Sequence, residues 1–320
     1  MQQEWAAAFA ETARRYWTED RTRELVGDRH PAILPGEAPV LLRALGLLYR
    51  DGSMPREKIR KYRQINHMLA VLQPSLRTLR DRHAVVRIVD AACGRSYLST
   101  LIAWYFREHW KHPVQILGVD RKPALVEESR RRVAMIGLDD VLRFTASSLD
   151  AFAPSSAWTD VFGALAPGEP VFHGLVSLHG CDTVTDDALA LAFQNAIEVV
   201  AVVPCCQAEL SRLWAEQEAS VDDSPVASIW KSGHLRRATA AHITDVYRLL
   251  LMQGAGYDAQ AMEFVPFEHT PRNTLLRGVR VSTGDAAALE EYRQLKRQLG
   301  GVGIGLEARL PVAAPTEAPR

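Results

Sequence analysis

The feature that most constrains the fold of this chain is an alternation, starting after residue 84, of short apolar runs with longer amphipathic segments. The apolar runs cover 85–90, 114–120, 141–145, 174–179 and 199–203, and helical patterns at 98–110, 123–136 and 186–196 lie among them. Continuously apolar runs of this length are typical of parallel strands that are covered on both faces. Strands that alternate with helices predict right-handed crossovers, and therefore an α/β fold with a doubly wound, Rossmann-like sheet.

The end of the pattern differs from its beginning. A helix at about 235–253 is followed by two further apolar runs, 261–267 and 275–281, which only residues 268–273 separate. Such a link is too short for a parallel crossover and predicts a hairpin. The expected sheet is thus seven-stranded and mostly parallel, with an antiparallel C-terminal hairpin, which distinguishes it from an ordinary nicotinamide-binding fold.

The remaining segments suggest how the chain is organised. We expect a helical N-terminal extension over 1–80, the α/β domain over 81–282, a helix over 283–300 and a disordered Gly/Ala/Pro-rich tail over 301–320. Within the extension, basic residues at 56–63 lie opposite an apolar helix face. This run is either a solvated helix face or a surface for a polyanionic substrate.

Composition limits the classes of function. Of the 320 residues 47% are apolar and 24% charged, which is typical of a protein with a real core. No apolar run reaches the roughly 18 residues of a membrane span, and the first 17 residues resemble an amphipathic helix more than a leader peptide. Four cysteines are too few for a disulfide framework, so we expect a reducing compartment, the cytoplasm. The formal net charge of zero argues against non-specific nucleic-acid binding.

The junction of the first strand and the first helix carries the strongest functional signal. Asp90 ends the strand, and the small residues around Gly94 predict a tight turn that lets a ligand approach the backbone. About 30 residues later Asp120 ends the second strand, where an acid accepts hydrogen bonds from ribose hydroxyls. Asp90 is positioned to pair with a cationic amino group of the same ligand. Each feature alone also fits an ordinary α/β loop or a helix cap, but their order predicts a nucleoside-type cofactor.

The absence of a phosphate-binding glycine pattern narrows the class of cofactor further. The chain has no G-x-G-x-x-G run, so a pyrophosphate would lack its usual cradle. S-adenosylmethionine has no phosphate and needs no such cradle. The expected cofactor-binding residues lie at the ends of four strands: Asp90, Ala92, Cys93, Gly94, Tyr97, Asp120, Arg121, Ser147, Ser148 and His179.

Four blocks of the sequence resemble successive motifs of one methyltransferase family. They are DAACGRSYLS (90–99), LHGCDTVTDDAL (178–189), VPCCQ (203–207) and residues 268–273, and 61–67 resembles the helix that precedes the domain in relatives. The family is the class I S-adenosylmethionine-dependent methyltransferase group whose domain also occurs in the glutathione S-transferase C-terminal-domain-containing protein. Eukaryotic tRNA ribose 2′-O-methyltransferases with a comparable Cys-Cys block are more distantly similar. The resemblance covers about residues 55–281 and implies the cofactor more firmly than the acceptor.

The chain departs from that family pattern at two positions of the turn. Members of the family usually carry glycine where this chain has Ser96, and many class I enzymes have glycine where it has Ala92. Both replacements are small, but their Cβ atoms narrow the approach to the backbone.

The expected reacting end lies beyond the carboxyl ends of the later strands, where ligands of doubly wound sheets bind. Methyl transfer is an in-line displacement that depends mainly on alignment, and His179 or Asp182 is the candidate base if the acceptor must lose a proton. Alternatively, Asp182 caps a helix and His179 is a hydrogen-bonded core residue. The loops after the fourth and fifth strands and the link of the closing hairpin are expected to converge over the methyl group. The substrate-binding candidates lie after the fifth strand and in the hairpin link: Pro204, Cys205, Cys206, Gln207, His269, Arg272 and Asn273.

The cysteines allow several interpretations. We expect no metal site, because the chain has no C-x-x-C pair and neighbouring side chains at a strand end should point apart. A covalent role stays open, but Cys205 and Cys206 are expected to be small packing residues beside the cofactor.

The sequence therefore predicts a methyltransferase (EC 2.1.1.-) whose acceptor is RNA, either tRNA or rRNA. Arg236, Arg237, Arg272 and the basic run at 56–63 make RNA physically reasonable, and neither a membrane nor a metal is an expected partner. A protein or small-molecule acceptor and a non-catalytic, cofactor-binding scaffold are the alternatives. A protein partner is left open.

Overall fold

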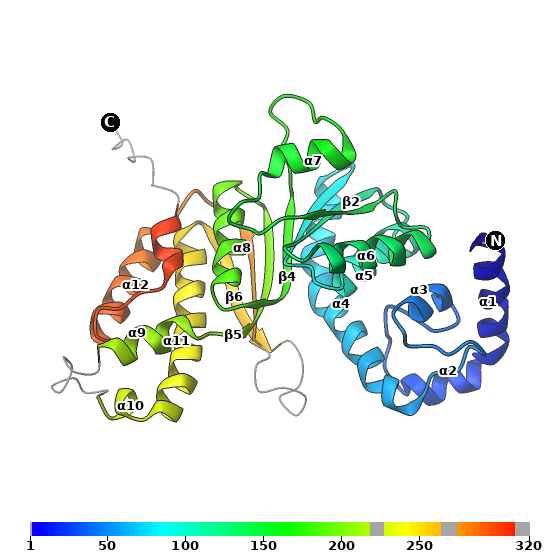
Figure 1. Cartoon of the computed structure of the whole chain (residues 1–320), viewed down its shortest axis with the longest axis horizontal. Coiled ribbons are helices and arrows are strands. Elements are labelled where there is room, and N and C mark those ends of the chain that lie inside the picture. Colours follow the sequence, from blue (N-terminus) through cyan, green and yellow to red (C-terminus); the bar gives the residue numbers. More distant parts are fainter. Residues whose placement is uncertain (1, 218–226, 264–273, 311–320) are drawn as a thin grey trace. The chain divides into compact units, whose positions relative to one another are not determined.

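The computed structural model describes residues 2–217, 227–263 and 274–310 (Figure 1). The chain divides into two compact units, one formed by 1–147 with 156–163 and the other by 148–155 with 164–320. The domain boundaries expected at residues 80, 282 and 300 stay predictions.

The first unit combines the N-terminal helices with three parallel strands. The helices are α1 (Gln2–Tyr16), α2 (Glu19–Val26), α3 (Pro39–Ala44) and α4 (Arg56–Arg82). The strands β1 (Val86–Ala91), β2 (Val114–Asp120) and β3 (Leu142–Ala146) lie in the order β3-β2-β1. All six residues of β1 are buried, as a strand covered on both faces requires.

The connections of this unit are helical, as the alternation predicts. After β1 come α5 (Tyr97–Trp104) and a π-helical turn, η1 (Tyr105–His109), where one continuous helix over 98–110 was expected. After β2 comes α6 (Pro123–Met135). The register pairs Asp90 with Gly118 and Asp120 with Ala146, which sets the carboxyl ends of the three strands beside one another.

The second unit carries the other four strands. Parallel β4 (Gly174–Cys181) and β5 (Val199–Cys206) are followed by antiparallel β7 (Thr274–Arg280) and β6 (Tyr257–Glu263), in the order β4-β5-β7-β6. The seven strands form a mixed sheet, mostly parallel with an antiparallel C-terminal pair and flanked by helices, which confirms the predicted fold class. The link expected at 268–273 lies outside the described residues.

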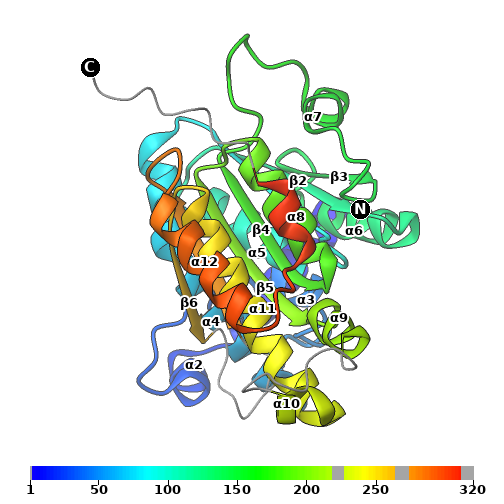
Figure 2. The same cartoon turned by 90° about the vertical axis from the view of Figure 1, so that its left-hand side faces the viewer.

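The helices of this unit are α8 (Thr183–Gln194), α9 (Glu209–Glu216), α10 (Ala227–Lys231), α11 (Gly233–Gly254) and α12 (Ala286–Gln298). Helix α12 packs along α11, which in turn contacts β6 and β7 (Figure 2). Three short helices were not expected from the sequence: α7 (Pro154–Phe162), α9 and α10. Among the described residues, none of the helices has both the length and the apolar character that crossing a bilayer requires.

The expected disorder of 301–320 is wrong for the first part of that segment. Residues Gly305–Arg309 form a 3₁₀ helix, η3, and the side chains of Ile304 and Leu306 are buried. Glu307 accepts hydrogen bonds from Tyr292 and Lys296 of α12. A composition rich in small residues conceals these few anchoring contacts, and residues 311–320 lie outside the described ones.

Candidate functional site

The carboxylate of Asp90 lies at the end of β1 and is almost completely buried, with 1% of the residue exposed. Burial raises its pKa to about 7, although hydrogen bonds from Ser99 act in the opposite direction. Among the described residues, Oδ1 of Asp90 has no hydrogen-bond partner. A buried carboxylate oxygen without a donor is costly in a folded protein unless a ligand supplies one. This is the feature expected of an acid that receives a cationic amino group.

The turn after Asp90 adopts a left-handed backbone at three small residues. The φ angles are 58° at Ala92, 54° at Gly94 and 51° at Ser96. The two positions at which the resemblance would have glycine are thus positions that favour glycine conformationally. The buried Ser96 hydroxyl also has no partner within the part of the chain that the structure describes. The predicted tight turn is therefore confirmed, with two L-residues held in a strained conformation.

Asp120 closes this turn from the end of β2. Its Oδ2 accepts a hydrogen bond from the Gly94 backbone N–H at 2.8 Å, and its Oδ1 accepts one from the Lys122 N–H at 2.9 Å. The carboxylate is therefore directed at the turn, and each oxygen keeps a further lone pair for a hydroxyl donor. A Cβ atom added to Gly94 would meet no atom within 4 Å, so side chains do not fill the space beside the turn.

Cys93 belongs to the same turn but packs toward β2. A Cβ atom at Gly118 would lie 3.1 Å from the Cys93 Sγ and 2.5 Å from the Phe144 ring, so glycine at 118 makes room for both side chains. Burial raises the pKa of the Cys93 thiol well above its usual range. The arrangement resembles that of a packing residue, and a contact of Cys93 with a cofactor stays a prediction.

Tyr97, at the start of α5, lies between two cationic side chains. Lys61 Nζ of α4 lies 5.6 Å from the centroid of its ring, and the Arg132 guanidinium carbon of α6 lies 5.2 Å from it. Burial lowers the pKa of Lys61. Arg132 also donates to the Arg95 carbonyl and so ties α6 to the turn. The sequence analysis placed Lys61 in a basic run and in the segment that resembles the helix before the domain, and neither cation was predicted to reach Tyr97.

The positions of the other expected cofactor residues do not indicate a cofactor as clearly. The Ser147 N–H donates to the Asp120 carbonyl at 3.1 Å, which continues the strand edge. Ser148, in the second unit, hydrogen-bonds with Asp150 and lowers the pKa of that carboxyl. Arg121 is exposed. His179 lies in β4, and the placement of its side chain lies outside what the structure describes.

In the second unit, the ends of β4 and β5 are irregular. Leu178 pairs with Val203 and Gly180 with Pro204, so His179 is an extra residue on β4; Cys181 then pairs with Cys206, so Cys205 is an extra residue on β5. Two compensating bulges therefore lie side by side, and bulges re-aim side chains at strand ends.

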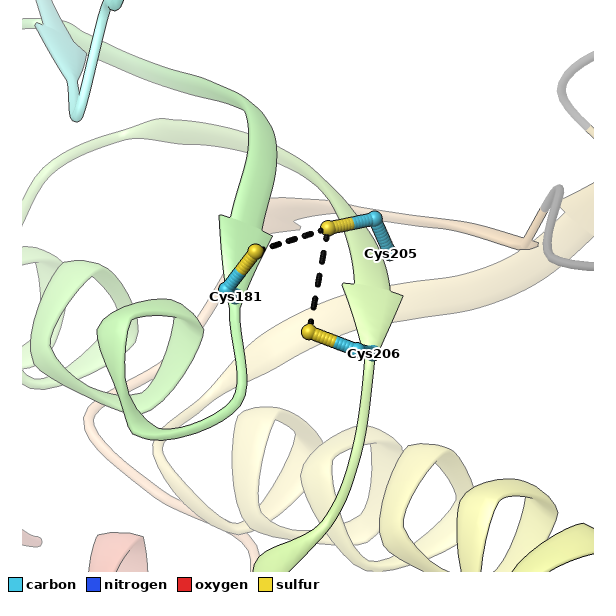
Figure 3. Close-up of side chains that lie close together, drawn as sticks. All are labelled: Cys181, Cys205 and Cys206. Atoms are coloured by element: carbon cyan, nitrogen blue, oxygen red, sulfur yellow. Dashed lines mark hydrogen bonds between the residues drawn. The ribbon is translucent and has the colours of Figure 1, made fainter.

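The bulges bring three thiols together (Figure 3). Sγ of Cys181 and Sγ of Cys205 are 3.1 Å apart, and those of Cys205 and Cys206 are 4.0 Å apart. The expectation that the two neighbouring side chains point apart is therefore wrong, because alternation fails at a bulge. Burial, and next the hydrogen bond with Cys181, raises the pKa of Cys205 to about 12, and burial also raises that of Cys206.

Asp182 directly follows Cys181, and its side chain caps a helix. Its φ is 51°, and its Oδ1 accepts hydrogen bonds from the backbone N–H groups of Ala208 at 2.8 Å and Glu209 at 3.0 Å. It thus caps α9, not the helix that follows it in sequence, to which its side chain makes no capping bond. A role of Asp182 as a base stays a prediction.

Behind these strand ends lies a buried network that sequence reasoning missed. Arg248, fully buried on α11, donates from Nε to Asp186 at 2.7 Å and lies 3.5 Å from Asp245. Gln207 Nε2 donates to both carboxylate oxygens of Asp245, at 2.9 and 3.0 Å. Burial raises the pKa of both carboxyl groups. The one signal in the sequence was a lone arginine at a position of α11 that helical periodicity places in the core.

The remaining substrate-binding candidates are only partly placed. Pro204 and Gln207 are buried, whereas His269, Arg272 and Asn273 lie outside the described residues. The loops after β4 and β5 do meet, through the Asp182 N–H, which donates to the Cys206 carbonyl at 2.8 Å. Convergence of the third loop stays a prediction.

Solved structures with a similar fold include several methyltransferases, all with TM-scores below 0.5. They include a putative rRNA methylase from Clostridium thermocellum (13% identity, 67% of this chain and 97% of that one, TM-score 0.38). A Podospora anserina methyltransferase with bound S-adenosylhomocysteine (SAH) has 12% identity over 82% of this chain and 95% of that one, with a TM-score of 0.41. The N-terminal domain of human METTL16 in complex with SAH has 10% identity over 77% and 80%, with a TM-score of 0.41.

Sequence comparison gives a more specific result. No curated protein matches the chain. Residues 60–213, slightly under half of the 320 residues, match the model of a family described as "Methyltransferase domain". The matched segment includes α4 from residue 60 onward, the turn between β1 and α5, Asp120 and the thiol-bearing ends of β4 and β5. The part of this chain that carries the candidate site is therefore similar to a methyltransferase domain.

Proposed function

We propose that this protein is an S-adenosylmethionine-dependent methyltransferase whose cofactor binds over the turn between β1 and α5. The observation that carries the proposal is the pair of carboxylates at this turn. Asp90 has a buried oxygen without a donor, and Asp120 is held against the Gly94 N–H. The cofactor has complementary groups, namely a cationic amino group and two ribose hydroxyls, and it lacks the phosphate that this turn could not cradle.

Different residues at the turn would bind different parts of the cofactor. Asp90 would accept hydrogen bonds from the amino group, a charge-assisted contact in a buried place. Asp120 would accept from the ribose hydroxyls, because its orientation is already fixed by two backbone donors. The open space beside Gly94 would admit the amino-acid part of the cofactor. When bound, the cofactor supplies an electrophilic methyl group, and the protein mainly aligns the acceptor with it.

We further propose RNA as the acceptor and a reducing compartment, such as the cytoplasm, as the location. Exposed arginines on α4, at 56, 60 and 63, present positive charge on a chain whose net charge is zero. Cationic side chains of this kind position a nucleic acid through its phosphates. The four cysteines are free, as a reducing compartment favours. The more distant resemblance to the tRNA 2′-O-methyltransferases supports the same choice.

A methyl-transfer assay tests this proposal. The full chain is incubated with S-adenosylmethionine labelled in its methyl group and with total RNA, total protein or a small-molecule extract from cells that lack this protein. We expect label in the RNA fraction, removable by ribonuclease, and little label with Asp120→Asn. Asp139→Asn, a change at an exposed aspartate outside the turn, is the matched control and should transfer normally. Label that enters only protein would contradict the RNA acceptor, and no transfer to any fraction, small molecules included, would contradict the enzyme.

A further inference from the structure

The three thiols at the ends of β4 and β5 have the spacing of metal ligands. Sγ atoms of Cys181, Cys205 and Cys206 all lie within 4.8 Å of one another, with separations of 3.1 and 4.0 Å for two of the pairs. Zinc–thiolate bonds of about 2.3 Å in tetrahedral geometry place sulfur atoms about 3.8 Å apart. The observed separations bracket that value, so small rotations of the side chains can place one ion in contact with all three.

The pairing of β4 and β5 brings the thiols to this arrangement. Cys205 is the extra residue of the β5 bulge, so Cys205 and Cys206 together oppose Cys181 on β4. The neighbouring Asp182 caps α9 and donates its own N–H to the Cys206 carbonyl, which fixes the loop from both sides. A preformed site of this kind loses little conformational freedom on binding an ion.

We propose that Cys181, Cys205 and Cys206 bind one Zn²⁺ ion as thiolates and leave its fourth position open to water or to a ligand. Cys181 is exposed, so the ion has a path from solvent. Among the side chains that the structure describes, which do not include that of His179, no fourth His, Cys, Asp or Glu ligand joins the three. Three protein ligands with an open position are the arrangement of catalytic zinc sites, whereas structural sites use four.

The chemistry of binding balances in charge. Three thiols release three protons to solvent as three sulfur–zinc bonds form, so the site with its ion carries one negative charge. Soft thiolate ligands favour zinc over the hard ions magnesium and calcium. The proposal is independent of which acceptor the protein methylates.

Zinc binding to the full chain is the direct test. The protein is reduced, freed of metal with a chelator, and titrated with ZnCl₂ against a chromophoric competitor. Co²⁺ in place of Zn²⁺ reports thiolate ligands through a charge-transfer band in the near ultraviolet. We expect one ion per chain and that band, with affinity lowered by more than about tenfold in Cys181→Ser, Cys205→Ser and Cys206→Ser, since even outer-shell partners are worth about 10- to 100-fold.

Cys93→Ser is the matched control, because it removes the fourth cysteine of the chain and leaves the three thiols in place. It should bind zinc as the unaltered chain does. Circular dichroism confirms that each variant is folded, and the exposed Cys181 is the position at which serine disturbs packing least. Equal zinc affinity in all four variants would overturn the proposal. So would a reduced chain that binds no zinc while the oxidised chain forms a Cys181–Cys205 disulfide.

Discussion

Asp90 is the residue whose protonation the fold controls most strongly among the acids of the turn. Its carboxyl group is buried beside a second carboxylate, Asp120, and both the burial and the neighbouring charge favour the neutral form. A folded-state pKa above the unfolded value means that the folded protein holds this proton more tightly. The stability that the proton contributes is present at low pH and is lost as pH rises toward about 7.

Replacing Asp90 by Asn should therefore change how stability depends on pH. From pH 5 to pH 8 the cofactor-free, unaltered protein should lose stability relative to Asp90→Asn, by up to roughly 3 kcal/mol, because a pKa difference of one unit corresponds to about 1.4 kcal/mol and the loss ends near the folded-state pKa of about 7. Urea unfolding at the two pH values measures this. Asp139→Asn, at an exposed position, should show no such relative change, and parallel profiles for Asp90→Asn and the unaltered protein would contradict the account.

Ala92 and Ser96 give a second prediction at the scale of single residues. Both hold positive φ angles, and Ser96 also buries a hydroxyl without a partner among the described residues. Ala92→Gly and Ser96→Gly should each raise the free energy of unfolding by about 0.5–1 kcal/mol, since relief of left-handed strain outweighs the added freedom of the unfolded chain. Thermal unfolding checks this. Ala91→Gly, in the adjoining strand, should instead lower the free energy of unfolding. A lower free energy of unfolding in all three variants would show that Ala92 and Ser96 are not strained.

At the scale of elements, the buried Arg248 joins α11 to α8 through Asp186, and both side chains are at most 2% exposed. The Arg309–Asp187 pair offers a contrast, because the Arg309 side chain is 41% exposed. Breaking a buried pair leaves an uncompensated charge, whereas exposed pairs contribute little.

Arg248→Met should accordingly lower the free energy of unfolding by about 3–5 kcal/mol, and Arg309→Met by less than about 1 kcal/mol. Chemical denaturation of the two variants makes the comparison. The double variant Arg248→Met/Asp186→Leu should recover part of the loss, because it removes both charges. Equal losses for Arg248→Met and Arg309→Met would show that the buried pair does not tie the two helices together.

The elements also show how far the sequence determines the fold. Apolar runs set the strands to within a few residues, because burial on both faces leaves little choice of side chain: 114–120 was predicted and β2 covers the same residues. The turn and its two acids were predictable because strand, acid and small residues follow one another in sequence. The thiol cluster was not, because a bulge is a property of how two strands pair, and neither strand alone indicates it. The Arg248 network joins residues 62 positions apart and was hidden for the same reason.

At the scale of the whole molecule, the formal net charge of zero makes local charge decisive for any RNA binding. Each phosphate contact made by a basic side chain contributes to the salt dependence of binding. Among the described residues, the exposed arginines of α4 are the clearest candidates for such phosphate contacts.

Replacing Arg56, Arg60 and Arg63 by Gln should weaken RNA binding and reduce its salt dependence, by up to about one unit of logarithmic slope for each lost contact. Filter binding at several salt concentrations measures the slope. Arg293→Gln/Arg297→Gln on α12, a change of exposed arginines of the second unit, is the control and should leave the slope unchanged. An unchanged slope in the triple variant would assign those arginines to a solvated face.

The central claim is that two carboxylates at one turn bind an adenosyl amino acid, and calorimetric titration of the full chain with SAH tests it most directly. The account predicts binding of one ligand per chain, loss of that binding in Asp120→Asn and retention in Asp139→Asn. Failure of the unaltered chain to bind at millimolar ligand, or equal binding by Asp120→Asn and the unaltered chain, would contradict it.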